Sequence, residues 1–256
     1  MFFPLSDDDS KLGGPSYVTW TLIALNLIVF AYQSFNPAFT TGWSLIPQEI
    51  MTGQDLIEST IIETDGEIFE VPQEPGPPII YLTLLSSMFM HGGVMHIGGN
   101  MLYLWIFGDN VEHRFGWFWF IVFYLVSGLA ASFAQIAVNP DGVIPNLGAS
   151  GAIFGILGAY LVLFPRNKVK TVVMYYAVSL PAIVVIGTWA AIQLFFTYGT
   201  VMSAEQSTGG VAYAAHLGGM VAGALIGLVA RNVLKDEPET TISRIDRSDP
   251  KSHRWW

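Results

Sequence analysis

Long apolar runs separated by polar segments dominate this chain of 256 residues. A helix needs roughly 17 to 25 mostly apolar residues to cross the hydrocarbon core of a bilayer. Runs of this kind predict six membrane-spanning helices, at residues 17–35, 94–107, 117–138, 148–164, 171–198 and 211–233. The second and fourth are shorter and richer in glycine, which is typical of central helices surrounded by protein. The pattern therefore predicts an all-α membrane protein, a bundle of six transmembrane helices without an internal repeat.

The longest connection is the loop of residues 36–93. Its first part, GWSLIPQEIMTGQDLI, is amphipathic and predicts short helices in the membrane interface. Its second part, EIFEVPQEPGPP, is acidic and rich in proline, so we expect a solvated excursion without regular structure. The expected organisation is an N-terminal segment, 1–16, a membrane domain, 17–233, into which this loop is inserted, and a mobile polar tail, 234–256.

Composition agrees with a membrane protein and excludes several functions. Hydrophobic residues make up 52% of the chain and charged residues only 12%. The net charge of -9 argues against nucleic acid as a partner, because phosphate binding needs clustered Lys and Arg. The chain has no cysteine, so disulfides, thiolate metal sites and a cysteine nucleophile are excluded.

The basic residues predict how the chain crosses the membrane, because cytoplasmic loops retain Lys and Arg. With six spans, all 11 Lys and Arg residues fall on the side that carries both termini. The opposite loops, at 36–93, 139–147 and 199–210, contain no Lys or Arg but many acidic residues. We therefore expect both termini in the cytoplasm of a prokaryotic cell. The first helix is too long and wrongly flanked for a cleavable signal peptide, so we expect it to be retained.

Strongly polar residues inside membrane spans are costly, and each is a candidate functional residue. His96 and Asn100 lie in the second span, Ser150 in the fourth and His216 in the sixth. These three spans run in the same direction, and at about 1.5 Å of rise per residue all four side chains fall at a similar depth in the outer leaflet. Asn100 follows His96 by four residues, so the two share one helical face.

This arrangement predicts serine hydrolase chemistry. A serine hydroxyl becomes a strong nucleophile when a neutral imidazole takes its proton, and the oxyanion that forms needs hydrogen-bond donors. Ser150 is the candidate nucleophile and His216 the candidate general base and acid, with His96, Asn100 and the Ser150 N–H as oxyanion donors. No Asp or Glu lies at this depth in the spans, so we expect a Ser–His dyad. Phe154, one helical turn after Ser150, is placed to pack on the imidazole.

Glycines predict how the hydroxyl reaches the imidazole. Gly151 and Gly155 form a GxxxG pair just after Ser150, and Gly219 and Gly223 form another just after His216. Small residues at this spacing let two membrane helices approach closely. We therefore expect the two pairs to face each other.

Each candidate also has a simpler interpretation. Serine among glycines is a common packing residue of membrane helices, and His216 can be a satisfied polar contact or part of a proton relay. His96 and Asn100 can join two helices by a hydrogen bond. His91 and His96 suggest a metal pair, but a spacing of five disfavours a shared helical face, so no metal is expected. The common depth across three spans favours the catalytic interpretation, because independent packing residues have no reason to share it.

Three motifs in this order resemble the rhomboid intramembrane serine proteases. HGGVMHIGGNMLYLWIFGDNVEHRFG resembles the second helix and following loop of that family, GASGAIFG its GxSG nucleophile motif, and AHLGGMVAG its AHxxGxxxG helix. The resemblance covers residues 17–231. It implies that Ser150 is the nucleophile, His216 the base, and His96 and Asn100 the oxyanion donors. Gly148 matches the glycine before the nucleophile, and Gly219 and Gly223 match the close-packing glycines.

The chain departs from the family at two places. Many members have Tyr where Phe154 stands, which loses a hydroxyl but keeps the ring. Some bacterial members carry a Trp-Arg pair in the first outer loop, whereas this loop has Trp43 and no arginine. The acidic, proline-rich insert is an addition.

The resemblance implies hydrolysis of peptide bonds in or beside the transmembrane segment of single-pass membrane proteins, at a site that opens to the outer face. It implies no cofactor, no metal and no partner beyond substrate and membrane lipid. The fifth span, with Pro181, Gly187 and Trp189, resembles the mobile lateral gate of the family. One alternative is a rhomboid-like pseudoprotease that binds client helices, although such relatives typically lack the serine or the histidine. Another is a transporter, although the polar residues do not cross the whole membrane.

Overall fold

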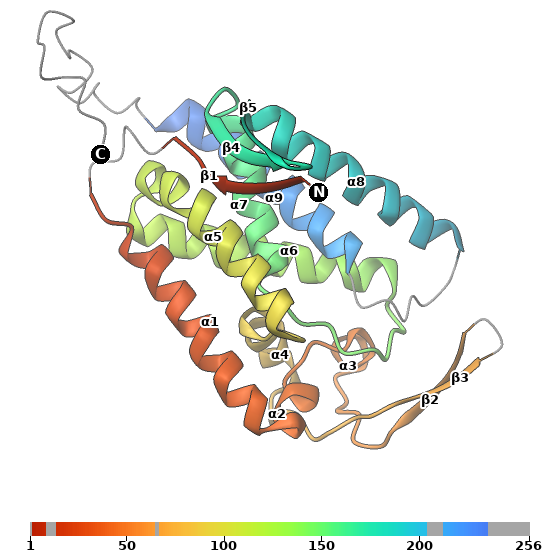
Figure 1. Cartoon of the computed structure of the whole chain (residues 1–256). Coiled ribbons are helices and arrows are strands. Elements are labelled where there is room, and N and C mark those ends of the chain that lie inside the picture. Colours follow the sequence, from red (N-terminus) through yellow and green to blue (C-terminus); the bar gives the residue numbers. More distant parts are fainter. Residues whose placement is uncertain (1, 9–13, 65–66, 204–211, 235–256) are drawn as a thin grey trace, which may run out of the picture.

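The computed structural model describes residues 2–8, 14–64, 67–203 and 212–234. Helices occupy the six predicted positions: α1 (Tyr17–Phe35), α5 (Val94–Phe115), α6 (Trp117–Val138), α7 (Ser150–Leu163), α8 (Ala182–Ser203) and α9 (Tyr213–Val233). In Figure 1, α1 runs along the left edge of the bundle and α8 along the right, while α7 lies in the middle and contacts α5, α6, α8 and α9. The predicted polar tail from residue 235 onward lies outside the described residues.

Length and composition identify only some of these helices as spans. Among the described residues, α1, α6 and α9 are long and apolar enough to cross a bilayer. A fourth span results if residues 80–89 and α5 form one broken helix, bent by 76°. Residues 80–89 consist of η1 (Ile80–Leu82), α4 (Thr83–Ser86) and η2 (Ser87–Phe89). The 14 residues of α7 reach about 21 Å, less than the ~30 Å of the hydrocarbon core. Six complete spans therefore stay a prediction.

The prediction of an all-α protein is wrong for the segment between α7 and α8, which forms strands. Strands β1 (Phe2–Ser6), β4 (Lys168–Val173) and β5 (Tyr176–Pro181) form an antiparallel sheet in the order β1-β4-β5. The exposed side chains of Lys168 and Lys170 alternate with the buried ones of Val169 and Thr171, which is the period of a strand. The fifth helix consequently begins at Ala182 and not at residue 171.

The prediction for the second half of the long loop is also wrong. Strands β2 (Thr60–Thr64) and β3 (Glu67–Val71) form an antiparallel hairpin that projects from the helices (Figure 1). The prolines begin only at Pro72, after the last strand residue, so they do not interrupt the pairing. The first half agrees with the prediction of short helices, with α2 at Pro37–Gly42 and α3 at Pro47–Thr52.

Two carboxylates, a buried one at Glu112 and a partly buried one at Asp7, hold the N-terminal part of the chain to the bundle. The Glu112 carboxylate, near the end of α5, accepts hydrogen bonds from the backbone N–H groups of Val18 and Thr19 at 2.9 and 2.7 Å. A negative charge at the start of a helix compensates its unpaired N–H groups and its dipole. The carboxylate of Asp7, just after β1, accepts from the Asn110 amide at 2.8 Å and from the Tyr160 hydroxyl. The strand before α1 is thus anchored to both α5 and α7.

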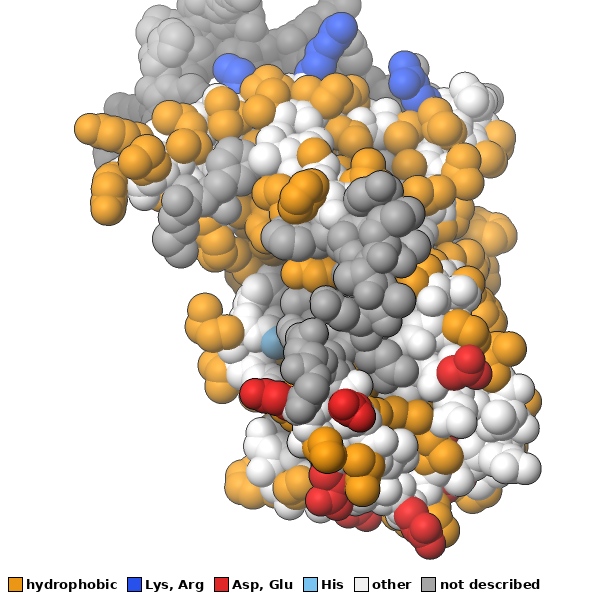
Figure 2. All heavy atoms as spheres, turned by 90° about the vertical axis from the view of Figure 1, so that its right-hand side faces the viewer, with side chains coloured by type: hydrophobic (Ala, Val, Ile, Leu, Met, Phe, Trp, Pro, Cys, Tyr) orange, Lys and Arg blue, Asp and Glu red, His pale blue; other side chains and the backbone are white. Residues whose placement is uncertain are grey.

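The bundle has two unlike ends. We call the end with β1, β4 and β5 the sheet side, and the opposite end, where α7 begins, the site side. The described Lys and Arg residues lie at the sheet side: Arg114, Arg166, Lys168, Lys170 and Arg231. On the face in Figure 2, Lys and Arg side chains lie at the upper end and Asp and Glu side chains at the lower end. This separation of charge supports the orientation that places the sheet side in the cytoplasm, which stays a prediction.

The long loop covers the site side and fixes the segment that precedes α7. Leu45 and Asn146 exchange two backbone hydrogen bonds, of 2.9 and 2.7 Å, and the Gln73 side chain donates to the Val143 carbonyl at 2.8 Å. The Gly148 N–H donates to the Ser87 carbonyl at 2.9 Å. These bonds leave little freedom in the chain just before Ser150.

Candidate active site

The structure brings Ser150 and His216 together from two different helices. Ser150 is the first residue of α7, and His216 lies in the first turn of α9. The Ser150 Oγ and His216 Nε2 atoms are 2.7 Å apart, a hydrogen-bond distance. This is the geometry in which an imidazole can remove the hydroxyl proton.

Glycines make this approach possible. A Cβ atom on Gly219 would overlap the carbonyl of Gly151, and one on Gly223 would overlap the carbonyl of Gly155. The two GxxxG pairs therefore face each other with backbone against backbone. We call the contact between α7 and α9 along these glycines the glycine seam. Because no side chains separate the helices there, residues next to the glycines are held at fixed positions.

The Phe154 ring lies flat on the His216 imidazole. Their ring centroids are 4.3 Å apart and their planes differ by 8°. Phe154 is one turn after Ser150 on α7, so a single helix presents both the hydroxyl and the stacking ring. The stack restricts rotation of the imidazole while leaving its two nitrogens free to form hydrogen bonds.

His96 lies beside the serine across a small space in front of Gly148. A Cβ on Gly148 would lie 3.0 Å from His96 Nε2 and 3.4 Å from Ser150 Oγ, and the Gly148 φ of 138° also disfavours a side chain. His96 Nδ1 accepts the Gly92 N–H at 3.3 Å, so the proton of the neutral ring is on Nε2. A hydrogen-bond donor thus points into the space next to the serine.

Asn100 lies one turn further along α5. Its side chain is 8% exposed, and its Nδ2 atom is buried without a hydrogen-bond partner among the described residues. Buried donors are nearly always paired, so an unpaired one needs an explanation. A transient acceptor, such as the oxygen of a bound substrate, supplies one.

His91 is closer to His96 than the sequence argument assumed. The two rings meet edge to face with centroids 5.1 Å apart, because His91 precedes α5 and helical spacing does not apply to it. Both His91 ring nitrogens are buried without a hydrogen-bond partner in the described parts of the chain. The described residues contain no group of three or more His, Cys, Asp or Glu suited to a metal.

The sequence analysis missed Gln193. This residue of α8 is 4% exposed, and its Oε1 atom is 2.7 Å from His216 Nδ1. The available signal was the same one that identified the other residues, a strongly polar side chain inside an apolar run. The prediction of a dyad rests on the absence of Asp and Glu at this depth, and it leaves a neutral amide as partner of the histidine out of account.

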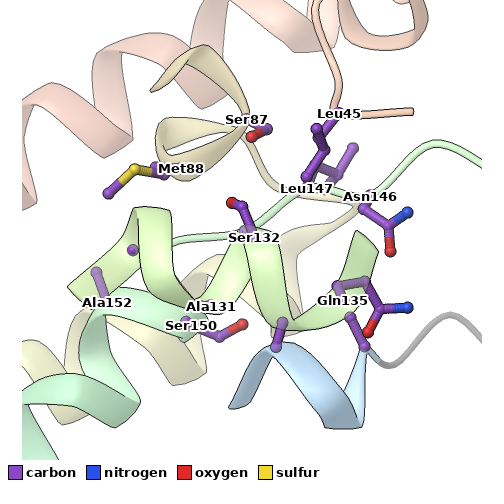
Figure 3. A pocket seen from close by; sticks show the side chains of 15 residues that line it. Leu45, Ser87, Met88, Ala131, Ser132, Gln135, Asn146, Leu147, Ser150 and Ala152 are labelled. Carbon is purple, nitrogen blue, oxygen red and sulfur yellow. The ribbon is translucent and has the colours of Figure 1, made fainter. Parts of the chain in front are cut away.

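A small pocket reaches Ser150 from the site side. Its volume is about 40 Å³, room for a few water molecules. Figure 3 shows Ser150 at its wall together with polar side chains from other elements, among them Ser87, Ser132, Gln135 and Asn146. The Gln135 Oε1 atom is buried without a partner among the described residues, which suits contact with water.

Comparison with known proteins identifies the class to which this helical membrane protein belongs. Residues 80–233 match the Rhomboid domain, which is more than half of the chain. The chain is therefore a multi-pass membrane protein of the rhomboid family.

Individual relatives agree with this assignment. The chain is 28% identical to "Rhomboid protein 1, mitochondrial" of Saccharomyces cerevisiae over 221 residues, which is 83% of this chain and 53% of that protein. It is 28% identical to "Rhomboid protease GluP" of Bacillus subtilis over 211 residues, 82% of this chain and 34% of that one. It is 32% identical to "RHOMBOID-like protein 5" of Arabidopsis thaliana over 146 residues, 57% of this chain and 43% of that protein.

The chain spans about half or less of the length of these relatives. They come from a yeast, a bacterium and a plant, and one of them is mitochondrial. The kind of membrane and the direction of the chain in it therefore stay predictions.

Proposed function

We propose that the protein is an intramembrane serine endopeptidase that hydrolyses peptide bonds in or next to the transmembrane segment of other membrane proteins. The observation that carries the proposal is the 2.7 Å contact between Ser150 Oγ and His216 Nε2. A serine that only fills space between helices has no need of an imidazole at this distance. Membership of a family that includes a protein named a protease adds support.

Acylation uses the contacts around Ser150. The hydroxyl proton passes to His216 Nε2 as Oγ bonds to the carbonyl carbon of the substrate, and the carbonyl oxygen becomes an oxyanion. His96 Nε2 and Asn100 Nδ2 are the proposed side-chain donors to this oxyanion. The Ser150 N–H belongs to the first turn of α7, whose N–H groups lack partners within the helix, and it is the third proposed donor. His216 then gives its proton to the leaving amine as the carbon–nitrogen bond breaks.

Deacylation needs a water molecule at the acyl-enzyme. The pocket next to Ser150 has room for water and polar side chains to hold it. His216 Nε2 takes a proton from this water, the hydroxide oxygen bonds to the acyl carbon, and the bond to Oγ breaks. The serine regains its proton from the histidine, and the carboxylic acid product leaves.

The proposed substrates are single-pass transmembrane proteins. A helical amide is shielded by its own hydrogen bonds, so a substrate must unwind locally, and we expect residues such as Gly or Pro near the cleaved bond. With the sheet side in the cytoplasm, cleavage takes place near the outer face of the membrane. Entry from the lipid is proposed to occur between α5 and α8, where the rings of Tyr103 and Trp189 meet at 5.8 Å.

A fluorophosphonate probe tests the proposal in the detergent-solubilised protein. The probe bonds to a serine oxygen only when that oxygen is activated, so we expect labelling of the native protein and none of Ser150→Ala or His216→Ala. Incubation with a transmembrane substrate should give cleavage that depends on the same two residues. Labelling that persists in Ser150→Ala would overturn the assignment. A correctly folded native protein that neither labels nor cleaves would favour the pseudoprotease.

A further inference from the structure

Gln193 occupies an unusual place on α8. Among the residues from Gly187 to Phe195, Gln193 is buried and all the others are half-buried or exposed. Burying the polar amide of a glutamine inside a membrane protein is unfavourable unless a hydrogen-bond partner compensates it. Its carbonyl oxygen lies 2.7 Å from His216 Nδ1, the ring nitrogen that does not face the serine.

From this geometry we infer that Gln193 is a positioning residue for His216, acting as a neutral third member of the site. The inference rests on the proposed function. Because an amide oxygen can only accept a hydrogen bond, it keeps the ring proton on Nδ1. Nε2 is then left with its lone pair toward the Ser150 hydroxyl, which is the tautomer that a general base needs.

An amide suits this position better than a carboxylate. A buried carboxylate in the apolar part of a membrane protein carries a large desolvation cost, whereas an amide carries a smaller one that a single hydrogen bond offsets. When His216 takes the serine proton, its Nδ1–H still points at the oxygen end of the amide dipole. The imidazolium is therefore stabilised without a second buried charge.

The same contact makes the histidine depend on α8. Trp189 lies one turn before Gln193, on the same face of α8, and its ring meets Tyr103 of α5 edge to face. The serine, the stacking ring and the imidazole are all carried by α7 and α9. Gln193 thus brings a third helix into the alignment of the base, and a displacement of α8 would remove the acceptor from Nδ1.

Substitution of Gln193 tests the inference. Gln193→Leu keeps the size of the side chain but removes the acceptor, and we expect fluorophosphonate labelling to slow by roughly 10–100-fold, as when other partners that orient a histidine are removed. Gln193→Glu restores an acceptor oxygen, at the desolvation cost of a carboxylate, and should label clearly faster than Gln193→Leu. The matched control is Thr188→Val, an exposed position on the same helix where the hydroxyl donates to its own helix, at Val184. This control should label at the native rate.

The ¹⁵N spectrum of histidine-labelled protein provides a readout that a purely structural role would not change. The His216 signals are assigned by their loss in His216→Ala, and in the native protein we expect the proton on Nδ1. A native proton on Nε2 overturns the inference even if Gln193→Leu fails to fold. A folded Gln193→Leu that labels at the native rate overturns it, and so does equal slowing in the Leu and Glu variants. If the native protein does not label at all, the proposed function fails, and the tautomer still decides whether Gln193 positions the ring.

Discussion

The glycine seam and helix α8 show two ways of holding a polar group inside a membrane protein. Along the seam, α7 and α9 touch through their backbones, and residues 151–160 of α7 are buried without exception. On α8, the residues from Gly187 to Phe195 are half-buried or exposed except Gln193, which reaches the site from a stretch of helix that buries little else. Ser150 and His216 are thus fixed by backbone contact, whereas the partner of Nδ1 is fixed only by where α8 lies.

The difference separates two requirements of the proposed reaction. The distance between hydroxyl and imidazole must stay constant, because a change of about 1 Å between reacting groups is costly. Entry of a substrate helix, by contrast, requires some part of the bundle to move. With Ser150 and His216 on the glycine seam and the proposed substrate entry at α8, α8 can move while the Ser150–His216 distance stays unchanged.

Substitutions in the glycine seam should reduce stability and labelling more than substitutions elsewhere in the molecule. In Gly219→Ala the added methyl group overlaps the Gly151 carbonyl, so the helices must separate next to Ser150. Overpacking of this kind costs about 1–3 kcal/mol of stability, and we expect labelling by fluorophosphonate to fall at least ~100-fold. The control is Gly187→Ala on α8, where a Cβ meets nothing within 4 Å. Thermal unfolding and labelling of the two variants should differ sharply, and equal behaviour would contradict a tight seam.

A crosslink between α5 and α8 separates substrate entry from chemistry. The chain has no cysteine, so Tyr103→Cys with Trp189→Cys gives a unique pair for a short cleavable thiol crosslinker. With α8 held against α5, we expect cleavage of a transmembrane substrate to fall at least ~10-fold. Labelling by the small probe should stay close to that of the uncrosslinked double variant, because Gln193, His216 and Ser150 keep their places.

The uncrosslinked double variant and the reversed crosslink are the controls for this experiment. Cleavage should return when the crosslinker is cut. If substrate is cleaved at the same rate with the crosslink in place, α8 is not the entry point.

Removing the Phe154 ring that stacks on His216 should slow labelling less than the changes above. Phe154→Leu keeps an apolar side chain but removes the flat contact with His216. Stacking contributes about 0.5–1.5 kcal/mol beyond burial, which corresponds to roughly 2–10-fold in labelling rate. Phe154→Tyr preserves the ring and should react at nearly the native rate. Unchanged kinetics in the Leu variant would mean that the seam and Gln193 alone hold the imidazole.

Glu49, in α3 of the long loop, should affect stability and not activity. Burial raises the pKa of its carboxyl to about 7, the Leu56 N–H opposes this rise, and Asp55 adds to it. The folded protein therefore takes up a proton between pH 4.5 and 7 that the unfolded chain does not hold, so stability falls as pH rises through this range. Above pH 7 this contribution is constant.

Glu49→Gln removes this dependence. The amide oxygen can still accept from Leu56, as Glu49 Oε1 does at 2.8 Å. We expect a melting temperature a few degrees above the native value at pH 8 and no difference near pH 4.5, with labelling unchanged at both. A Gln variant that is less stable at pH 8 would show that the carboxylate is ionised and compensated in the fold.

The sequence predicted the positions of the six helices because their apolar runs are long and bounded by turns. It failed at residues 171–181, predicted as the start of the fifth helix, where Val, Thr and aromatic residues are as apolar as a membrane span but continue a strand that begins at Lys168. It also failed at residues 60–71, because prolines that follow the hairpin were taken to disrupt it. In the first case mean apolarity was weighted above the period of the pattern, and in the second the prolines were weighted above the strand-forming residues that precede them.

For the site, the sequence alone determined which side chains lie at one depth, because helical rise and chain direction fix the depth of Ser150, His96, Asn100 and His216. Which of them touch depends on how the helices are rotated and packed, and only the tertiary structure decided that. It joined Ser150 to His216 across the glycine seam, and it placed Gln193 of α8 at Nδ1. The rotation of a helix about its own axis follows from contacts with all its neighbours, and no single run of residues contains that information.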